Sequence, residues 1–241
     1  MIILVNGATA GFGESITRRF IENGHKVIAT GRRQERLQEL KDELGDNLFT
    51  AQVDVRNRAA IEEMLANLPA EWKEIDVLVN NAGIWLSGYV TEISPQDWDL
   101  VMNVNLKAIF HLSQLFVNHC LQHDQMGSIL NITSQAAFHG STTGHAHYAA
   151  SKAGLVAFAI SLAREVAKQK INVNNIAVGI MDTAMIRKNI EQNPDYYVSR
   201  IPVGRVAQPQ EIADIGVFMV SPKTSYMTGA TLDVTGGMLM R

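Results

Sequence analysis

One tyrosine and one lysine in the segment HYAASKAG (147–154) have the spacing of a proton-transfer pair. Tyr148 stands four positions before Lys152, among small side chains. Residues i and i+4 lie on one face of a helix, so the phenol and the amine would lie one above the other. A phenol exchanges protons poorly at neutral pH, and a nearby ammonium lowers its pKa by favouring the phenolate. The pair is therefore a candidate acid/base device, with a solvated surface tyrosine and lysine as the alternative.

Length and composition narrow the class of protein. The chain has 241 residues, 46% of them hydrophobic and 19% charged, with a net charge of −3. These values are typical of a globular protein and exclude a long disordered tail. The small charge gives no electrostatic reason to expect nucleic acid or an acidic membrane surface as a partner. The sequence contains no run of 18 consecutive apolar residues, so we expect no transmembrane helix.

Two further features indicate the compartment. Cys120 is the only cysteine, which excludes an internal disulfide and a cysteine metal site, and we expect it to be buried on a helix. The first residues, MIILVNGATAG, contain a short apolar run without the basic flank of a signal peptide. We therefore expect a soluble, cytoplasmic protein.

The elements that would position this pair alternate along the whole chain. Apolar, β-rich runs predict strands at 2–6, 25–31, 48–55, 75–83, 127–133, 170–178 and 230–235. Helical patterns lie between them at 13–23, 33–44, 58–68, 95–123, 148–168 and 209–220. Apolar strands that alternate with helices indicate a parallel sheet covered on both faces. The sequence therefore predicts an α/β, three-layer, doubly wound Rossmann fold with a seven-stranded parallel sheet, as a single domain over 1–241.

Glycines follow the first predicted strand, in NGATAGFG (6–13). Gly7 and Gly11 would let the backbone turn tightly and approach a ligand, and Gly13 would open a helix whose N-terminal amides can hold a pyrophosphate. The spacing is G-x-x-x-G-x-G, so the common G-x-G-x-x-G fingerprint is absent as written. The position at the first strand–helix junction nevertheless favours a dinucleotide site.

The end of the second predicted strand bears on the type of dinucleotide. An acidic residue there would bind the ribose hydroxyls of NAD, whereas arginine accommodates the 2′-phosphate of NADP. This strand runs into TGRR (30–33), which offers Arg32 and Arg33 and no acid. We therefore predict NADP(H) over NAD(H). The alternative is that the arginines face solvent, and the glycine turn has Ala10 where a second basic residue would strengthen the prediction.

Together these motifs resemble the short-chain dehydrogenase/reductase family, from Leu4 almost to the C-terminus. The resemblance rests on NGATAGFG (6–13), Asp54 and Val55, NNAG (80–83), NVNLKA (103–108), NITS (131–134), YAASK (148–152), NVNNIAVGIMDTAM (172–185) and VTGG (234–237). Residues 1–76 are similar to bacterial NADP-dependent 3-hydroxy acid dehydrogenases. The C-terminal half is similar to β-ketoacyl carrier-protein reductases and polyol dehydrogenases. The two halves therefore imply different substrates.

The resemblance implies four catalytic residues. Tyr148 would give a proton to the carbonyl oxygen during reduction, or remove it during oxidation. Lys152 would lower the pKa of the tyrosine and bind the nicotinamide ribose. Ser134 would hold the substrate oxygen, and Asn105 would anchor a water in the proton relay. The expected activity is hydride transfer between the cofactor and a carbonyl or alcohol.

The resemblance also implies the residues that hold the cofactor. Asp54 and Val55 would flank the adenine, and Thr183 would bond the nicotinamide carboxamide. The full set of expected cofactor contacts is Gly7, Thr9, Gly11, Phe12, Gly13, Arg32, Arg33, Asp54, Val55, Asn81, Ala82, Gly83, Tyr148, Lys152, Gly179, Ile180 and Thr183.

The sequence departs from the family pattern at three places. Asn6 stands where threonine is usual, and its side chain keeps a hydrogen-bonding group there. Val178 replaces the usual proline before the nicotinamide-binding segment, which loosens that turn. Ser134 and Tyr148 are separated by one residue more than is common. The extra residue lies in a loop that we expect to cover the substrate.

That loop, AAFHGSTTGHAH, contains His139, His145 and His147. Three histidines could in principle hold a metal, but no acidic or cysteine partner accompanies them, so we predict no metal site. We expect His139 and His145 at the substrate mouth, together with Met185. Trp85, which follows NNAG closely, either lines the pocket or packs in the core.

The segment IRKNIEQNPDYYVSRIP (186–202) has weak periodicity and, by resemblance, forms a mobile lid over the substrate. Arg187, Lys188 and Arg200 in it either meet a carboxylate or phosphate of the substrate or are solvated. The helices at 106–123 and 148–168 carry apolar residues on more than one face, which favours a subunit interface. The resemblance implies a homotetramer, with a homodimer as the alternative.

Three functions follow from these patterns. The leading prediction is an NADP(H)-dependent carbonyl reductase or alcohol dehydrogenase with a small polar substrate. The first alternative is a β-ketoacyl thioester reductase, which would need a basic surface near the cleft for an acidic carrier protein. The second is a catalytically silent dinucleotide sensor, for which the proton-transfer residues would have no use.

Overall fold

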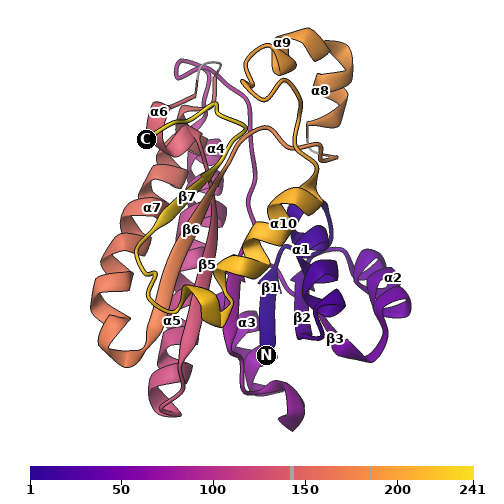
Figure 1. Ribbon diagram of the computed structural model, residues 1–241, viewed down its shortest axis with the longest axis vertical. Helices are drawn as coiled ribbons and strands as arrows, with labels where there is room; N and C mark the ends of the chain where they lie inside the picture. Colours follow the sequence, from indigo (N-terminus) through magenta and orange to yellow (C-terminus); the bar gives the residue numbers. More distant parts are fainter. Residues whose placement is uncertain (142–143, 185) are drawn as a thin grey trace.

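Seven parallel strands form the centre of the computed structural model, which describes residues 1–141, 144–184 and 186–241 (Figure 1). The strands are β1 (Ile2–Asn6), β2 (Lys26–Gly31), β3 (Leu48–Gln52), β4 (Val77–Asn80), β5 (Gly127–Ser134), β6 (Ile171–Val178) and β7 (Thr231–Val234). Their order is β3-β2-β1-β4-β5-β6-β7, and every neighbouring pair is parallel. The predicted doubly wound sheet is confirmed. The strand order reverses between β1 and β4, where open α/β sheets bind their ligands.

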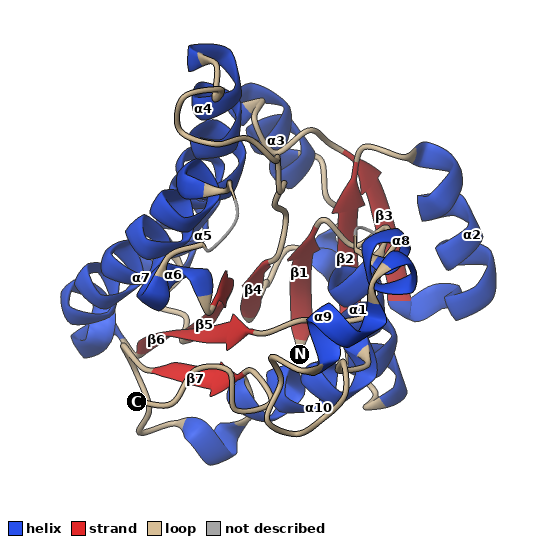
Figure 2. Ribbon diagram, turned by 90° about the horizontal axis from the view of Figure 1, so that it is seen from above, coloured by secondary structure: helices blue, strands red, loops and turns tan. Residues whose placement is uncertain are grey.

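Helices cover both faces of this sheet, which gives three layers (Figure 2). On one face lie α1 (Gly11–Glu22), α2 (Gln34–Leu44) and α10 (Pro209–Met219); on the other lie α3 (Arg58–Ala66), α5 (Ala108–Gln122) and α7 (Ala146–Val166). Each face has its own apolar cluster. Ile16 and Phe20, four residues apart on α1, are fully buried in the first, and Leu112 and Phe116 on α5 in the second.

The helix predicted at 95–123 has an interruption in its middle. It begins as α4 (Pro95–Met102), where the Ser94 hydroxyl accepts a hydrogen bond from the Asp97 amide at 3.0 Å. A π-helical turn, Asn103–Lys107, then leads into α5. By length and composition the whole rod Pro95–Gln122 is apolar enough to cross a membrane, but half of its most apolar window is buried inside the fold. It packs as a core helix.

Two predicted strands are too long. The segments at 48–55 and 75–83 contain strands that end at Gln52 and Asn80, because the residues after those positions leave the sheet and form loops at its carboxyl edge. The short helices α6 (Ala136–His139), α8 (Arg187–Gln192) and α9 (Pro194–Val198) lie beyond this edge (Figure 1). Short 3-10 turns occur at Gly45–Asn47, Ala70–Trp72, Ala167–Gln169 and Pro222–Thr224.

Candidate active site

The turn after β1, here called the glycine cradle, contains Gly7, Gly11 and Gly13, and a side chain at these positions would meet neighbouring protein atoms. Gly7 has φ +71°, and a Cβ there would lie 2.9 Å from the Ala82 Cα. A Cβ on Gly13 would lie 2.2 Å from the Gly7 carbonyl oxygen. Gly11 faces Thr183, whose Cγ2 would be 3.2 Å from an added Cβ. The backbone of this turn therefore lies close to the loop after β4 and to Thr183, as in a dinucleotide-binding turn where glycine permits close approach.

Two of the predicted cofactor residues in this turn have buried side chains. Phe12 is 4% exposed and belongs to the apolar cluster under α1, so it can offer a ligand only its backbone. Thr9 is 6% exposed, and its hydroxyl and carbonyl oxygens accept hydrogen bonds from Arg33. The turn is thus fixed from within the protein before any ligand is considered.

Asn6 fixes the opposite side of the cradle. Its Oδ1 accepts hydrogen bonds from the backbone amides of Asn81 at 3.0 Å and Ala82 at 2.6 Å. The Asn81 side chain donates in return to the carbonyl oxygen of Gly7 at 2.9 Å. Asn6 therefore keeps a hydrogen-bonding group at this position and ties β1 to the loop after β4.

Asn6 is also the end of a buried chain of amides that crosses the sheet. Asn6, Asn80, Asn131 and Asn175, here called the asparagine ladder, occupy paired positions on β1, β4, β5 and β6 and are fully buried. Each Nδ2 donates to the next Oδ1, at 2.9, 2.9 and 3.1 Å, and Asn175 donates to the Thr231 hydroxyl on β7 at 3.1 Å. Backbone donors fix the orientation of the first amide, and each amide then fixes the next.

The predicted 2′-phosphate residues lie at the end of β2. The Arg33 guanidinium donates to the Thr9 carbonyl oxygen at 2.8 Å and to its hydroxyl at 3.0 Å. Arg32 is exposed, and its carbonyl oxygen accepts a hydrogen bond from the Gln52 side chain at 3.0 Å. Arg33 therefore stands beside the glycine turn, whereas the contact of Arg32 is with the end of β3. Asp54 is ion-paired with Arg56, whose hydrogen bonds lower the pKa of that carboxyl.

The four predicted catalytic residues come from three elements that meet at the carboxyl edge. Ser134 ends β5, and its hydroxyl oxygen accepts a hydrogen bond from the Ala136 amide at 3.2 Å. Tyr148 and Lys152 lie on one face of α7, with Lys152 Nζ 5.9 Å from the Tyr148 ring centre. Lys152 is 4% exposed, and its ammonium donates to the Ile132 carbonyl oxygen at 2.8 Å.

Asn105 lies in the π-helical turn and is fully buried. Its Oδ1 accepts from the Ile84 amide at 2.8 Å, and its Nδ2 donates to the Ile84 carbonyl at 3.0 Å and to Ser151 at 3.1 Å. A Cβ on Gly83 would lie 3.4 Å from Asn105 Oδ1 and 3.5 Å from Lys152 Nζ. Gly83 thus keeps the space between these groups open. Such π turns occur frequently at functional sites.

Burial controls the protonation of the tyrosine and the lysine. Desolvation raises the pKa of Tyr148 above its usual value, and the hydrogen bond with Ser134 opposes that shift. Burial lowers the pKa of Lys152 from 10.5 to about 8. Desolvation and Ser134 are the causes of this shift, and the lowering of the Tyr148 pKa by Lys152 stays a prediction. At neutral pH both groups carry their protons, which suits proton donation to a carbonyl.

The segment after β6 keeps its place despite Val178. Val178 pairs with Ser134 and with Val234, and the Gly179 amide donates to the Val234 carbonyl at 3.1 Å. The Ala207 amide then donates to the Ile180 carbonyl at 3.2 Å. Hydrogen bonds on both sides replace the stiffness that proline would supply, so this turn is not loose. Gly179, Ile180 and Thr183 line the same cavity as Ser134 and Tyr148.

A cavity of about 410 Å³ is lined by Ser134 and Tyr148. Of the predicted substrate residues, Trp85, His139 and His145 line it, and Met185 lies outside the described residues. The rings of Trp85 and His145 stack with centres 4.1 Å apart, and His145 Nδ1 donates to the Leu86 carbonyl at 2.8 Å. Trp85 therefore lines the pocket and packs at the same time.

Several lining residues were not named individually from the sequence, although the predicted lid over 186–202 contains three of them. Gln135, Asn189, Tyr196, Tyr197 and Met238 contribute to the wall. Among them Gln135 is notable, because its Oε1 is buried without a hydrogen-bond partner among the described residues. A donor on the substrate would satisfy that oxygen. Its position directly after Ser134, at the carboxyl end of a predicted strand, is the signal that could have found it.

The remaining histidine of the loop faces elsewhere. His147 is 1% exposed, burial lowers its pKa, and it does not line the cavity. Within the described part of the chain, no three histidine, cysteine, aspartate or glutamate side chains gather closely enough to hold a metal ion. Cys120 is buried on α5 in the apolar cluster, and its desolvation raises the thiol pKa to about 11.

Comparison with known proteins adds a family and several relatives. The family model described as enoyl-(acyl carrier protein) reductase matches residues 7–239. The NADP-dependent 3-hydroxy acid dehydrogenase YdfG of Escherichia coli K12 is 43% identical over 235 residues, which cover 97% of this chain and 94% of that protein. The 3-oxoacyl-[acyl-carrier-protein] reductase FabG of Vibrio cholerae is 37% identical over 239 residues, covering 99% and 97%.

A solved structure agrees with these relatives. The crystal structure of serine dehydrogenase from Escherichia coli superposes with a TM-score of 0.83 at 41% identity and covers 97% of both chains. Both kinds of relative expected from the sequence are therefore present. Each aligns along nearly the whole chain rather than along one half of it.

Proposed function

The chain belongs to the short-chain dehydrogenase/reductase family of NAD(P)-dependent oxidoreductases, and we propose that it interconverts a small polar aldehyde or ketone and its alcohol with NADP(H). The observation that carries this proposal is the position of Ser134 and Tyr148. They line one cavity together with Thr183, which faces Gly11 of the glycine cradle. A carbonyl group in that cavity would meet a proton donor on one side and the cofactor site on the other.

Each residue of the site has a separate role in the proposed reaction. NADPH, when bound, supplies a hydride to the carbonyl carbon. Ser134 holds the carbonyl oxygen with its hydroxyl, which the Ala136 amide keeps in place. Tyr148 gives its phenolic proton to that oxygen, so that an alcohol forms. Lys152 and Asn105 line the route by which the proton of Tyr148 is replaced, and Gly83 leaves room for it.

Two observations support NADP(H) over NAD(H). The end of β2 presents Arg32 and Arg33 and no carboxylate, and Arg33 is held beside the glycine turn through Thr9. A planar guanidinium so placed would bind the 2′-phosphate of the adenine ribose. The 43% identical YdfG relative is NADP-dependent by name. Asp54 would approach the adenine only after adjusting its ion pair with Arg56.

The proposal is tested by titrating the protein with NADPH and NADH by fluorescence and then offering carbonyl compounds in the same cuvette. We expect tighter binding of NADPH and oxidation of NADPH with small oxo acids or semialdehydes. Equal affinity for both dinucleotides would contradict the cofactor assignment. Tight binding without turnover of any carbonyl compound would contradict the enzymatic proposal and favour a redox sensor.

A second candidate has direct support from one relative. FabG is 37% identical over nearly the whole chain, so the same cavity is a candidate site for a β-ketoacyl thioester. Turnover of β-ketoacyl thioesters alone, with none of small oxo acids, would favour this candidate. The cavity volume of about 410 Å³ fits a small substrate better than a long acyl chain.

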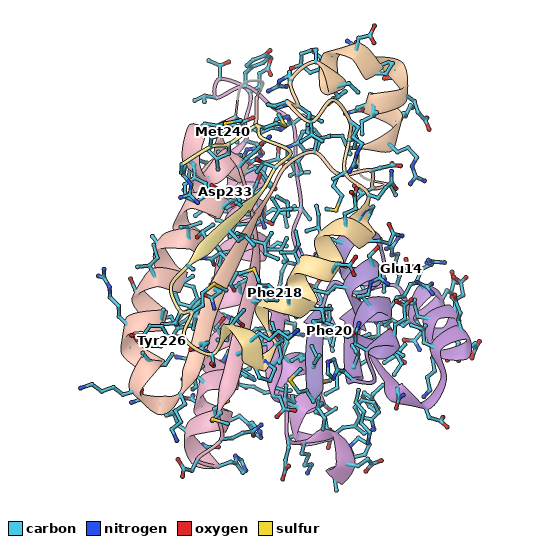
Figure 3. The ribbon with its side chains drawn as sticks, in the orientation of Figure 1. Glu14, Phe20, Phe218, Tyr226, Asp233 and Met240 are labelled. Atoms are coloured by element: carbon cyan, nitrogen blue, oxygen red, sulfur yellow. The ribbon has the colours of Figure 1, made fainter. Side chains whose placement is uncertain are left out.

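We further propose a cytoplasmic homotetramer, with a homodimer as the alternative, in which each copy is a single domain. Large apolar side chains are exposed on two sides of the molecule. Phe110 on α5 is 41% exposed and packs edge-to-face on Phe158 of α7. Phe218 on α10 and Tyr226 before β7 are exposed near the edge of the sheet (Figure 3). Light scattering coupled to size exclusion would decide, and a monomer would contradict the proposal.

A further inference from the structure

Gln135 Oε1 differs from the other polar atoms of the described cavity wall, because it is buried without a hydrogen-bond partner among the described residues. The other buried side-chain atoms of this kind in the described part of the chain belong to residues outside the cavity that contains Ser134 and Tyr148. A buried acceptor without a donor is unfavourable. In the wall of a cavity, a ligand can supply the donor that the fold does not.

The backbone of Gln135 is fixed at the carboxyl edge of the sheet. Its amide donates to the Val178 carbonyl at 3.0 Å, and its carbonyl oxygen accepts from the Phe138 amide at 3.0 Å. Gln135 follows Ser134 directly, so the two side chains start from Cα atoms about 3.8 Å apart. A carbonyl oxygen held by Ser134 and a group held by Gln135 would therefore belong to the same small part of one ligand.

The side-chain amide of Gln135 has a defined orientation. Its Nε2 donates to the Met238 sulfur at 3.5 Å, and a thioether can accept a hydrogen bond but cannot donate one. The nitrogen therefore faces the sulfur, and the oxygen is left to accept. The last torsion of a glutamine side chain is soft, so the oxygen can turn toward a ligand with the loss of only a weak N–H···S contact. This part of the wall favours a ligand with a hydrogen-bond donor.

A hydroxyl is the donor that fits the rest of the wall. The described lining residues include no aspartate, glutamate or lysine, whereas Arg200 contributes a guanidinium. A substrate ammonium would therefore meet no carboxylate in the cavity, and the loss of its hydration would go uncompensated. A hydroxyl needs no opposite charge. The donor that matches Gln135 Oε1 is therefore neutral.

We propose that Gln135 is a specificity-determining residue, whose Oε1 accepts a hydrogen bond from a hydroxyl group that the substrate carries beside its carbonyl. This hydroxyl is separate from the one that hydride transfer forms, so the reduced product carries two. The inference rests on the proposed function, because it concerns the cavity in which Tyr148 gives its proton. Gln135 acts on which carbonyl compound binds and takes no part in the transfer of the hydride or the proton.

The test compares two ketones of nearly the same shape: hydroxyacetone, which has the hydroxyl, and butanone, which has a methyl group in its place. Wild type is compared with Gln135→Met and with the matched control Gln192→Met, which makes the same change on α8 outside the cavity. A hydroxyl also activates the neighbouring carbonyl, so the measured quantity is the ratio of the two kcat/KM values in each protein. We expect Gln135→Met to lower the preference for hydroxyacetone by about 10- to 100-fold, mainly through KM, as for a lost hydrogen bond in a buried site.

Butanone is the internal control for a folded site. Its kcat/KM should change less than about threefold in Gln135→Met, because methionine has nearly the volume of glutamine. Gln192→Met should keep the wild-type ratio. An unchanged ratio in Gln135→Met would overturn the inference, because the oxygen would then be satisfied by a water with either ketone. A wild type that prefers butanone would overturn it too.

Binding measurements separate this inference from the proposed function. The dissociation constant for NADPH should be unchanged in Gln135→Met; weaker NADPH binding would assign the oxygen to the nicotinamide carboxamide and overturn the inference. If neither ketone is reduced, the proposed function fails. Calorimetric titration of the NADP⁺-loaded protein with propane-1,2-diol and with butan-2-ol then decides alone. Diol binding at least about tenfold tighter, with the difference lost in Gln135→Met, supports the hydroxyl site, and equal binding or none overturns it.

Discussion

The two sides of the active-site cleft are built differently. On the cofactor side, polar side chains bond mainly to one another: Asn6 holds the loop after β4, and the asparagine ladder continues from it to β7. On the substrate side, Gln135 and His139 line the cavity, and Gln135 Oε1 has no hydrogen-bond partner among the described residues. One side is complete without a ligand, and the other leaves hydrogen-bonding capacity for one.

The cofactor side is fixed by the fold, whereas the substrate side determines which substrate is selected. Strand register determines the cofactor side, because paired positions on neighbouring strands bring their side chains together. Loops and short helices determine the substrate side, where α6, α8 and α9 supply much of the wall. A common fold can therefore keep its cofactor chemistry while its substrate changes.

The largest effect is expected where the two sides meet, at Tyr148. Replacing Tyr148 by phenylalanine removes the proton donor and leaves the ring, so kcat for carbonyl reduction should fall by about 10²- to 10⁴-fold. NADPH affinity, a property of the cofactor side, should change little. Stopped-flow turnover and fluorescence titration measure the two separately. Activity close to that of the wild type would show that another group gives the proton.

A substitution in the asparagine ladder should destabilise the cofactor side of the cleft. Asn131→Ala removes one inner amide, which leaves Asn175 Oδ1 without this partner and Asn80 Nδ2 with only its hydrogen bond to the Ser113 hydroxyl. Each unsatisfied group costs about 1–3 kcal/mol, so the free energy of unfolding should fall by about 3 kcal/mol. The control is Asn172→Ala on the neighbouring strand β6. Its side chain makes one exposed hydrogen bond, so the substitution should cost less than about 1 kcal/mol. Urea denaturation compares the two, and equal losses would show that the ladder has no special role.

Arg33 tests whether the end of β2 selects the cofactor. Arg33→Ala should weaken NADPH binding by about 10- to 100-fold and NADH binding much less, because only NADPH carries a 2′-phosphate. Arg36→Ala, which removes a cation ion-paired with Glu14 outside the cradle, is the control. Equal weakening of both dinucleotides would mean that Arg33 acts only by holding Thr9.

The sequence predicts the cofactor side of the cleft better than the substrate side. Apolar strand patterns predict all seven strands, and the strand-end motifs identify Ser134 and the glycine cradle, because register places such residues at one edge. That Asn6 keeps a hydrogen-bonding group could be predicted, but its partners could not, since they lie in a loop 75 residues away in the chain. That Arg200 lines the cavity and Arg187 does not could not be predicted either, because it depends on how the segment after β6 folds.

The smallest predicted effect is one of pH, and it concerns the groups that join both sides. Burial lowers the pKa of Lys152 to about 8, while desolvation keeps the pKa of Tyr148 above its usual value. As the pH rises through about 8, the lysine loses its proton while the tyrosine keeps its own. The proton route behind Tyr148 is then less well supplied, so reduction should slow by about tenfold between pH 7 and pH 9.

A pH profile of kcat at saturating NADPH measures this effect, with NADPH affinity recorded over the same range. We expect kcat to fall as the pH rises, because the lowered pKa of Lys152 lies between pH 7 and pH 9. A lysine with an unperturbed pKa of 10.5 would keep its proton over this range, and kcat would then stay constant. A fall in kcat with unchanged NADPH affinity assigns the titration to the buried relay. A flat profile would show that Lys152 does not resupply the proton of Tyr148. A parallel loss of NADPH affinity would assign the titration to a group on the cofactor side of the cleft.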